Sequence, residues 1–346
     1  MSDAATRPAE HPDAAIFACD AGHLAYAYAA AMGIHHAEPE RRFDIVIATP
    51  DLSPVPEVAR RGPIRFRRID VSAIPPFRHG NPRITVGTFF RHLLPEILRD
   101  EYGALFYMDT DTWMRRPGLQ GLFDRRPRGV PLAAVASFIY RPDLLERPHP
   151  VSPRAERVLG AFAGTNGDYW QSGVQMIDIE AHLKARVAER LFSYVETHHD
   201  LLERHRLGDQ GALNAVFADE IVLLSPLWNW HHEDWHHPDL LERFDPHILH
   251  FTGRAKPWML ADEPLVGEVN PDWFAALSQW SPDFSPEARR GSAAWFEANP
   301  VFRLRPLDAL HRRAHVAVMR HKARRLAIGA SGQAAMQALI DAAEVA

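Results

Sequence analysis

The sequence predicts an α/β fold with a mostly parallel β-sheet and helices on both of its faces. Two observations support this. Short apolar runs alternate with stretches of helical spacing between residues 14 and 109, a pattern typical of β-α-β units. Two of these runs also stop directly at an aspartate, Asp20 and Asp109. Because ligands of such sheets bind beyond the carboxyl ends of the strands, we expect the functional residues there.

Each element follows from its local pattern. The apolar run over 14–19 predicts a buried strand, and the Ala-rich stretch over 24–32 predicts a helix. Thr49 and Pro50 end the next apolar run. In chain order, the predicted elements are strand 14–19, helix 24–32, strand 43–48, strand 64–71, helix 85–98, strand 104–108, strand 131–137, helices 180–198 and 208–218, and strand 247–251.

The chain divides into three expected regions. Residues 1–12 are polar and predict a disordered lead-in. Residues 13–275 hold the predicted elements and form the expected catalytic domain. Pro and Trp then punctuate the sequence, and 309–340 contain no acidic residue, so we expect a helical C-terminal extension over 276–346.

Composition excludes several classes of protein. A formal net charge of −5 over 346 residues gives no general attraction to nucleic acid. Cys19 is the only cysteine, which excludes an intramolecular disulfide and a cysteine-based zinc site. The N-terminus has no apolar stretch typical of a signal peptide, and no apolar run is long enough to span a membrane. These features predict a cytoplasmic protein.

Two acidic residues follow the predicted strand 104–108. Asp109 and Asp111 are separated by Thr110. On an extended chain their carboxylates would point to opposite faces, but both can reach one hard cation where the backbone turns at a strand end. The Asp-x-Asp pattern alone also fits a solvated turn. Its position after a buried strand favours a metal site that binds a diphosphate.

A second group lies after the predicted strand 247–251. His250, Gly253 and Lys256 fall within seven residues. An imidazole can complete a metal shell, a glycine lets the backbone approach a ligand, and a lysine offsets phosphate charge. A lone histidine at a strand end is more often structural, so it is the combination that predicts a diphosphate site.

Six short blocks follow one another along the chain at 17–20, 88–96, 105–111, 170–174, 208–214 and 250–258. In this order they resemble glycosyltransferase family 8, which includes glycogenin and the bacterial lipopolysaccharide galactosyl- and glucosyltransferases. The resemblance extends over about residues 14–260 and implies an A-type glycosyltransferase fold, Rossmann-like, of the nucleotide-diphospho-sugar transferases.

The resemblance implies a role for each matching residue. Asp109, Asp111 and His250 would ligate Mn²⁺, with Mg²⁺ as the alternative ion. Gly253 and Lys256 would contact the diphosphate, and Asp20 and His23 would contact the nucleotide base. Arg91 and Asp209 would bind the donor sugar's hydroxyls, and Gln210 would lie near the anomeric carbon. A neutral amide is a poor nucleophile, so we expect Gln210 to stabilise positive charge.

Two positions depart from the family's pattern. Gln171 stands where the family often has asparagine, which moves the amide that binds the sugar outward by one methylene. Ser137 stands where an acidic residue is expected. Both departures concern the donor sugar, so they leave its identity open between glucose and galactose.

Two further segments each fit two interpretations. His232 and His236 have the spacing of a helical zinc pair, but Pro238 and the tryptophans favour a loop of the acceptor cleft. Residues 311–325 carry a basic stripe, which fits either a solvated helix face or peripheral contact with anionic lipid.

The sequence therefore predicts a retaining hexosyltransferase that uses a UDP-sugar, a divalent metal and a glycan or glycolipid acceptor, as in lipopolysaccharide biosynthesis. Retention is implied by the resemblance alone. Two alternatives stay open: a catalytically silent scaffold that binds sugar nucleotides, and a nucleotide-sugar hydrolase. The hydrolase would not need Asp209 and Gln210 beside the sugar.

Overall fold

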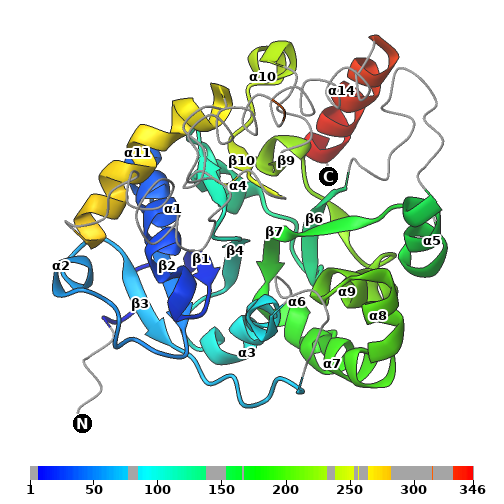
Figure 1. The fold of residues 1–346 in the computed structure, drawn as a ribbon, viewed down its shortest axis with the longest axis horizontal. Helices are drawn as coiled ribbons and strands as arrows, with labels where there is room; N and C mark the ends of the chain where they lie inside the picture. Colours follow the sequence, from blue (N-terminus) through cyan, green and yellow to red (C-terminus); the bar gives the residue numbers. More distant parts are fainter. Residues whose placement is uncertain are drawn as a thin grey trace.

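The structure is a computed structural model that describes residues 7–76, 85–137, 153–165, 167–231, 238–252, 256, 264–281, 314 and 330–345. Its centre is a seven-stranded sheet with the order β3-β2-β1-β4-β7-β6-β8 (Figure 1). The strands are β1 (Asp13–Ala18), β2 (Asp44–Thr49), β3 (Arg65–Arg68), β4 (Ala104–Met108), β6 (Leu132–Ala136), β7 (Trp170–Asp178) and β8 (Val222–Leu223).

Most neighbouring strands of this sheet run parallel, and β7 is the exception. It pairs antiparallel with both β4 and β6, whereas β1 pairs parallel with β2 and β4. The prediction of a mostly parallel sheet is confirmed. Strand β7 itself was not predicted, because Gln171, Ser172 and Gln175 interrupt its apolar pattern.

A second, three-stranded sheet lies beside the first and has the order β5-β10-β9. Its strands are β5 (Thr112–Met114), β9 (Trp230–His231) and β10 (Ile248–His250). Strand β10 pairs antiparallel with β5 and parallel with β9. Segments far apart in sequence, near residues 112, 230 and 250, therefore meet here.

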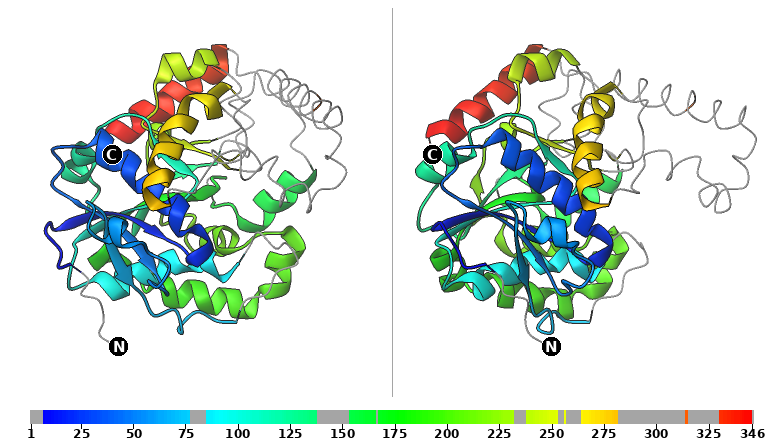
Figure 2. Two further views of the ribbon diagram at one scale, coloured as in Figure 1. Left: turned by 60° about the vertical axis from the view of Figure 1, so that its left-hand side comes forward. Right: turned by 90° about the vertical axis from the view of Figure 1, so that its left-hand side faces the viewer.

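Helices cover both faces of the large sheet (Figures 1 and 2). Along β1, Ala15 and Phe17 face one hydrophobic cluster, and Ala14 and Ile16 face the other. The helices are η1 (Ala21–His23), α1 (Leu24–Ala37), α2 (Glu57–Arg60), η2 (Val86–Leu93), α3 (Leu94–Leu98), α4 (Leu119–Arg125), α5 (Pro153–Phe162), α6 (Ile179–Lys184), α7 (Val187–Thr197), α8 (His199–His205), α9 (Asp209–Phe217), η5 (Pro226–Trp228), α10 (Pro238–Phe244), α11 (Pro264–Trp280) and α14 (Ala330–Val345).

Two predicted helices differ in the structure. The helix expected over 180–198 is two helices, α6 and α7, because the backbone between them passes through a left-handed residue, Arg186, with φ of 53°. The helix expected over 85–98 starts as the 3₁₀ helix η2 and continues as α3. Thr85 caps η2 by accepting a hydrogen bond from the Gly87 amide at 3.2 Å.

The predicted boundary between residues 275 and 276 falls inside α11. This helix lies along α1 (Figure 1) and buries Trp273 and Leu277 in the cluster that contains Phe17. Because an apolar helix face needs a partner to exclude water, α11 packs as part of the same layer as α1. Among the described residues, no helix is both long and apolar enough to cross a bilayer.

Candidate active site

Three side chains that could ligate a metal converge at the carboxyl end of β4. Asp109 follows β4, Asp111 precedes β5, and His250 ends β10. Their donor atoms all lie within 4.8 Å of one another. The Nε2 atom of His250 lies 3.3 Å from Oδ1 of Asp111 and 3.8 Å from Oδ2 of Asp109. The two carboxylates and one imidazole thus point at one position.

A tight turn brings the two carboxylates together, as expected for a strand end. The Thr112 amide and hydroxyl both donate to the Asp109 carbonyl, at 3.2 Å and 2.8 Å. The chain then enters β5, where Thr112 is the register partner of His250. Pairing between β5 and β10 therefore delivers the imidazole to the turn.

Gly173 on β7 lies so close to this cluster that no other amino acid would fit at this position. Its carbonyl accepts a hydrogen bond from the Asp109 amide at 2.7 Å. A Cβ atom at this position would lie 2.3 Å from Cε1 of His250 and 2.6 Å from Oδ2 of Asp109. The space for an ion and its three donors therefore depends on a glycine. Gly173 lies in the matching block 170–174, but nothing in the sequence pattern indicates this role.

The predicted donor-sugar residues Arg91 and Asp209 form a buried charge network with Asp109. Arg91 contacts Oδ1 of Asp109 at 3.0 Å and Oδ2 of Asp209 at 3.3 Å. Burial opposes the charge of Arg91, but the Asp109 and Asp209 carboxylates outweigh it and raise its pKa. Burial would also raise the pKa of Asp209, yet Arg91 and His92 lower it below its ordinary value. Both groups are therefore charged at neutral pH.

Arg91 has further partners that hold it in place. Its Nε atom donates to the Thr88 carbonyl at 3.0 Å, and another guanidinium nitrogen donates to the Ser172 carbonyl. The guanidinium also lies 4.5 Å from the centre of the Tyr107 ring. The Tyr107 hydroxyl donates to Oδ1 of Asp109 at 2.7 Å. Oδ1 of Asp109 is thereby occupied, while its Oδ2 atom faces His250.

Gln210 lies at the start of α9, directly after Asp209. Its Oε1 atom accepts a hydrogen bond from the Ser172 amide at 3.2 Å. Asn214, one turn further along α9, donates to the carbonyls of Gln210 and Trp170, each at 2.8 Å. The start of α9 is thus tied to β7, the strand that carries Gly173.

Lys256 contacts the cluster from the loop after β10. Its ammonium pairs with Oδ2 of Asp111 and donates to the Phe251 carbonyl at 2.6 Å. Burial would raise the pKa of Asp111, but the charges of Lys256 and His250 hold it well below its ordinary value. The Asp111 carboxylate is therefore anionic at neutral pH. Gly253 lies outside the described residues, as do His232 and His236.

Asp20 and His23 form a more exposed pair beside η1. Nδ1 of His23 lies 3.4 Å from Oδ1 of Asp20, which also accepts from the Gly22 amide at 3.0 Å. The hydrogen bond between them lowers the pKa of Asp20 and raises that of His23. The charges of Asp111 and Lys256 also act on the pKa of His23. This pair therefore borders the buried cluster on its open side.

One buried residue, Asn229, links Gln171 with His250. Oε1 of Gln171 accepts hydrogen bonds from the Gly173 amide at 2.6 Å and from Nδ2 of Asn229 at 2.9 Å. Oδ1 of Asn229 lies 2.8 Å from Nδ1 of His250. Asn229 was missed by sequence reasoning, which treated residues 228–237 as a loop of the acceptor cleft. Strand β9, which follows it, was not predicted either, so no predicted element marked this position.

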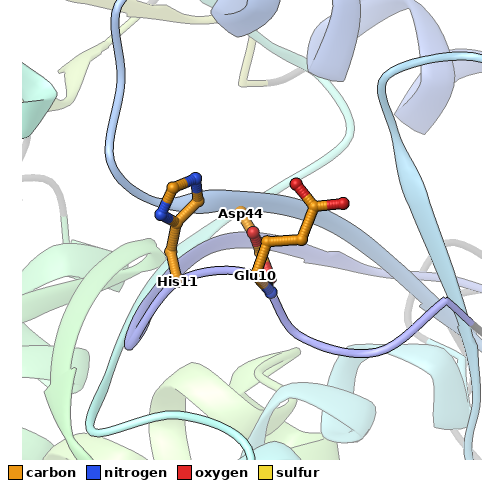
Figure 3. Close-up of side chains that lie close together, drawn as sticks. All are labelled: Glu10, His11 and Asp44. Atoms are coloured by element: carbon orange, nitrogen blue, oxygen red, sulfur yellow. Dashed lines mark hydrogen bonds between the residues drawn. The ribbon is translucent and has the colours of Figure 1, made fainter.

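A second cluster of metal-ligating types lies beside the amino-terminal ends of β1 and β2 (Figure 3). It comprises Glu10, His11 and Asp44. Oδ2 of Asp44 is already bonded to the Glu10 amide at 3.0 Å and to the Tyr102 hydroxyl at 2.8 Å. A cavity of about 340 Å³ here is also lined by Arg7, Arg41 and Arg65. Because these guanidinium groups repel a cation, we assign no metal site to this cluster.

Comparison with known proteins agrees with this arrangement. A profile described as Glycosyl transferase family 8 matches residues 15–261. The chain belongs to this family. The enzyme class predicted from the sequence, a hexosyltransferase of the family 8 type, is therefore confirmed.

Two curated relatives and one solved structure show what this family member is similar to. General stress protein A of Bacillus subtilis is 26% identical over 57% of this chain and 67% of its own length. Lipopolysaccharide 1,2-glucosyltransferase of Escherichia coli is 28% identical, but over only 34% of this chain and 35% of its own length. A crystal structure of the galactosyltransferase LgtC in complex with donor and acceptor sugar analogues has a TM-score of 0.59 at 20% identity, and covers 81% of this chain and 99% of LgtC. This likeness confirms the A-type glycosyltransferase fold.

Proposed function

We propose that this family 8 enzyme transfers a hexose, glucose or galactose, from a UDP-sugar to a hydroxyl of a glycan or glycolipid, with retention of anomeric configuration. A divalent metal ion, Mn²⁺ or Mg²⁺, would assist the reaction. The convergence of Asp109, Asp111 and His250 carries this proposal, because their donor atoms lie within 4.8 Å of one another and could hold one cation. Gln210 supports it with a neutral amide that is hydrogen-bonded to Ser172 on β7.

The three donors fit a divalent metal. Two carboxylate oxygens suit Mg²⁺ and Mn²⁺, and an imidazole nitrogen shifts the preference from Mg²⁺ towards Mn²⁺. Gly173 leaves the space that any side chain would fill. When bound, the metal would offset charge on the departing diphosphate. Lys256, which now pairs with Asp111, lies where its ammonium could turn to a phosphate oxygen.

The side chains nearest to the proposed sugar position favour a reaction without a covalent intermediate. Gln210 carries a neutral amide, which is a poor nucleophile but can stabilise positive charge at the anomeric carbon. Oδ2 of Asp209 is paired with Arg91 and His92, each at 3.3 Å, and these partners reduce the nucleophilicity of the carboxylate. We propose that the bond from the anomeric carbon to the diphosphate breaks, the acceptor oxygen bonds on the same face, and a diphosphate oxygen takes the acceptor proton.

The remaining predicted residues are assigned to the two ends of the donor. Asp20 and His23, at the open side of the cluster, would contact the nucleotide base. Gln171 would present the other end of its amide to the sugar, since its Oε1 atom is already bonded within the protein. Gly253 would contact the diphosphate.

The acceptor proposal includes a glycolipid, because one curated relative is a lipopolysaccharide 1,2-glucosyltransferase. Residues 311–325, of which only Ala314 is described, would then bring the enzyme to an anionic membrane surface through their basic stripe. We expect the full chain to float with anionic liposomes more than a 1–305 variant does. Equal flotation of the two would remove the membrane part of the proposal.

The central experiment measures UDP release from a panel of UDP-sugars with Mn²⁺, with and without saccharide acceptors, for wild type and Asp109→Ala. We expect metal-dependent release from one donor, at least about 100-fold lower in the variant. Release that does not depend on an acceptor would indicate a nucleotide-sugar hydrolase. Metal-dependent binding of UDP without turnover of any donor would indicate a silent scaffold.

A further inference from the structure

Asn229 is fully buried between a proposed metal ligand and a proposed sugar ligand. Its side chain bonds His250 on one side, with 2.8 Å between Oδ1 and Nδ1. On the other side it bonds Gln171, with 2.9 Å between Nδ2 and Oε1. It touches neither the Asp109 nor the Asp111 carboxylate through any hydrogen bond within the described residues. Its contacts therefore reach the site only through these two side chains.

One backbone amide determines the direction of every hydrogen bond in this chain of side chains. The Gly173 N–H can only donate, so the Gln171 atom that it contacts at 2.6 Å must be the oxygen. That oxygen also faces Asn229, so the Asn229 atom towards it must be the donor, Nδ2. The remaining Asn229 atom, facing His250, is then the acceptor Oδ1. Nδ1 of His250 must therefore carry a proton.

This arrangement of donors and acceptors affects both His250 and Gln171. When the imidazole is neutral, a proton on Nδ1 leaves the lone pair on Nε2, the atom that lies nearest to Asp111 and Asp109. At the other end, Oε1 of Gln171 is used twice within the protein. Its Nε2 group makes no hydrogen bond with the described part of the chain and stays a donor for an outside oxygen.

We infer that Asn229 is a positioning residue that couples the metal-binding imidazole to the amide that binds the donor sugar. It orients His250 for the metal and Gln171 for a sugar hydroxyl through the two ends of one amide. This inference rests on the proposed function, and adds to it a residue that contacts neither metal nor sugar. It also accounts for the longer Gln171: its extra methylene lets Oε1 turn back to the Gly173 amide and Asn229.

The experiment tests the two hydrogen bonds of the Asn229 amide separately, with variants that remove one or both. Asn229→Asp keeps an oxygen towards Nδ1 of His250 but has no donor for Gln171, whereas Asn229→Leu has neither. Gln171→Leu removes only the sugar end. Ser225→Ala is the matched structural control, because Ser225 caps the adjacent helix η5 through the Leu227 amide and touches neither His250 nor Gln171.

Two quantities are measured on the full-length protein. The first is the affinity for Mn²⁺ alone, by electron paramagnetic resonance. The second is the ratio of the dissociation constants of UDP and of UDP-glucose or UDP-galactose in saturating Mn²⁺, by calorimetry. This ratio isolates what the sugar contributes, and neither quantity depends on turnover.

We expect Asn229→Leu to lower Mn²⁺ affinity by about tenfold or more, as other residues that orient metal ligands do. Asn229→Asp should stay within about threefold of wild type, because a carboxylate accepts from an imidazole N–H at least as well as an amide does. Both variants should shift the sugar ratio by about tenfold against the UDP-sugar, the effect of a lost hydrogen bond. Gln171→Leu should shift only the ratio, and Ser225→Ala neither quantity.

Three results would overturn the inference. These are equal Mn²⁺ affinity of the Asp and Leu variants, an unchanged sugar ratio in both, or the same losses in Ser225→Ala. If Asn229→Leu does not fold, the Asp variant decides, since only a coupling role predicts retained Mn²⁺ affinity together with a shifted ratio. Wild-type protein that binds Mn²⁺ but no UDP-sugar would contradict the proposed function, and the comparison of Asp with Leu would still test the metal end.

Discussion

Gly173 and His250 approach so closely that a Cβ atom on the glycine would lie 2.3 Å from Cε1 of the imidazole. The same Cβ would lie 2.6 Å from Oδ2 of Asp109. This contact joins β7 of the large sheet to β10 of the small one. It makes the shape of the proposed metal site depend on the absence of a side chain on a neighbouring strand.

Gly173→Ala should therefore weaken metal binding. We expect Mn²⁺ affinity to fall by at least about tenfold and kcat/KM by about 100-fold or more, because displaced ligands are costly at a metal centre. Calorimetric titration with Mn²⁺ and initial-rate measurements check this.

The control for this prediction is Gly160→Ala in α5, where a Cβ would meet nothing within 4 Å. An exposed helical glycine replaced by alanine should leave Mn²⁺ affinity unchanged and raise stability by about 1 kcal/mol. Wild-type Mn²⁺ affinity in Gly173→Ala would show that the ion binds elsewhere.

Arg91→Met should destabilise the fold as well as the site. Its side chain is only 5% exposed and lies between Asp109 and Asp209. Its removal leaves two carboxylates without their shared partner, which typically costs about 3–5 kcal/mol. Urea unfolding followed by circular dichroism measures this.

Two further variants test that explanation of Arg91. Asp209→Asn in the Arg91→Met background removes one unpaired charge and should recover part of the lost stability. Arg186→Met, at an exposed ion pair with Glu189, should change stability very little. If the Arg91 and Arg186 variants unfold at the same urea concentration, the buried network is not stabilising.

Gln210→Ala should lower kcat much more than it changes binding of the donor. In the proposed reaction its amide stabilises charge that exists only in the transition state, and losing such a group typically costs about 100-fold in kcat. Its hydrogen bond with the Ser172 amide is only partly buried, so folding should persist. A rise in KM for the UDP-sugar with unchanged kcat would assign Gln210 to ground-state binding instead.

Stability should decrease as the pH falls below about 6.5, partly through His182 on α6. Burial lowers the pKa of this imidazole from 6.5 to about 3, with a smaller effect from His92. Below pH 6.5 the unfolded chain takes up a proton that the folded chain does not accept until about pH 3. The free energy of unfolding therefore falls with decreasing pH across this window, by about 1.4 kcal/mol per pH unit for one such group.

His182→Leu should flatten this dependence by roughly one proton between about pH 6 and pH 4. Urea unfolding at several pH values gives the slope for wild type and variant. The sign follows from a folded pKa below the unfolded one, so an unchanged slope in the variant would show that His182 is already protonated in the folded state over this range.

Local patterns were sufficient to predict the central strands of the sheet and the two aspartates that follow β4. The apolar runs that became β1, β2 and β4 are buried along their whole length, and such runs look alike wherever they occur in a parallel sheet. The turn after β4 was equally local, since Asp109 and Asp111 are separated by one residue. Their convergence could therefore be expected from the order of the residues.

Contacts distant in sequence could not be predicted in the same way. Strand β7 was missed because its buried polar residues serve the site rather than the core, and Asn229 was missed because its partners lie 58 and 21 residues away. The predicted boundary at residue 275 lies within α11. This helix packs along α1, and no pattern within α11 indicates that partner.

The sequence by itself determined the fold class, the family and the residue types of the site, because these follow from local periodicity and from ordered short motifs. Only the tertiary structure decided how the motifs act on one another. Strand β7 runs antiparallel to β4, so its amino-terminal half lies at the carboxyl end of β4 and Val174 pairs with Met108. That register puts Gly173 against His250 and lets Asn229 join His250 to Gln171, and strand pairing between distant segments is set by the packing of the whole domain.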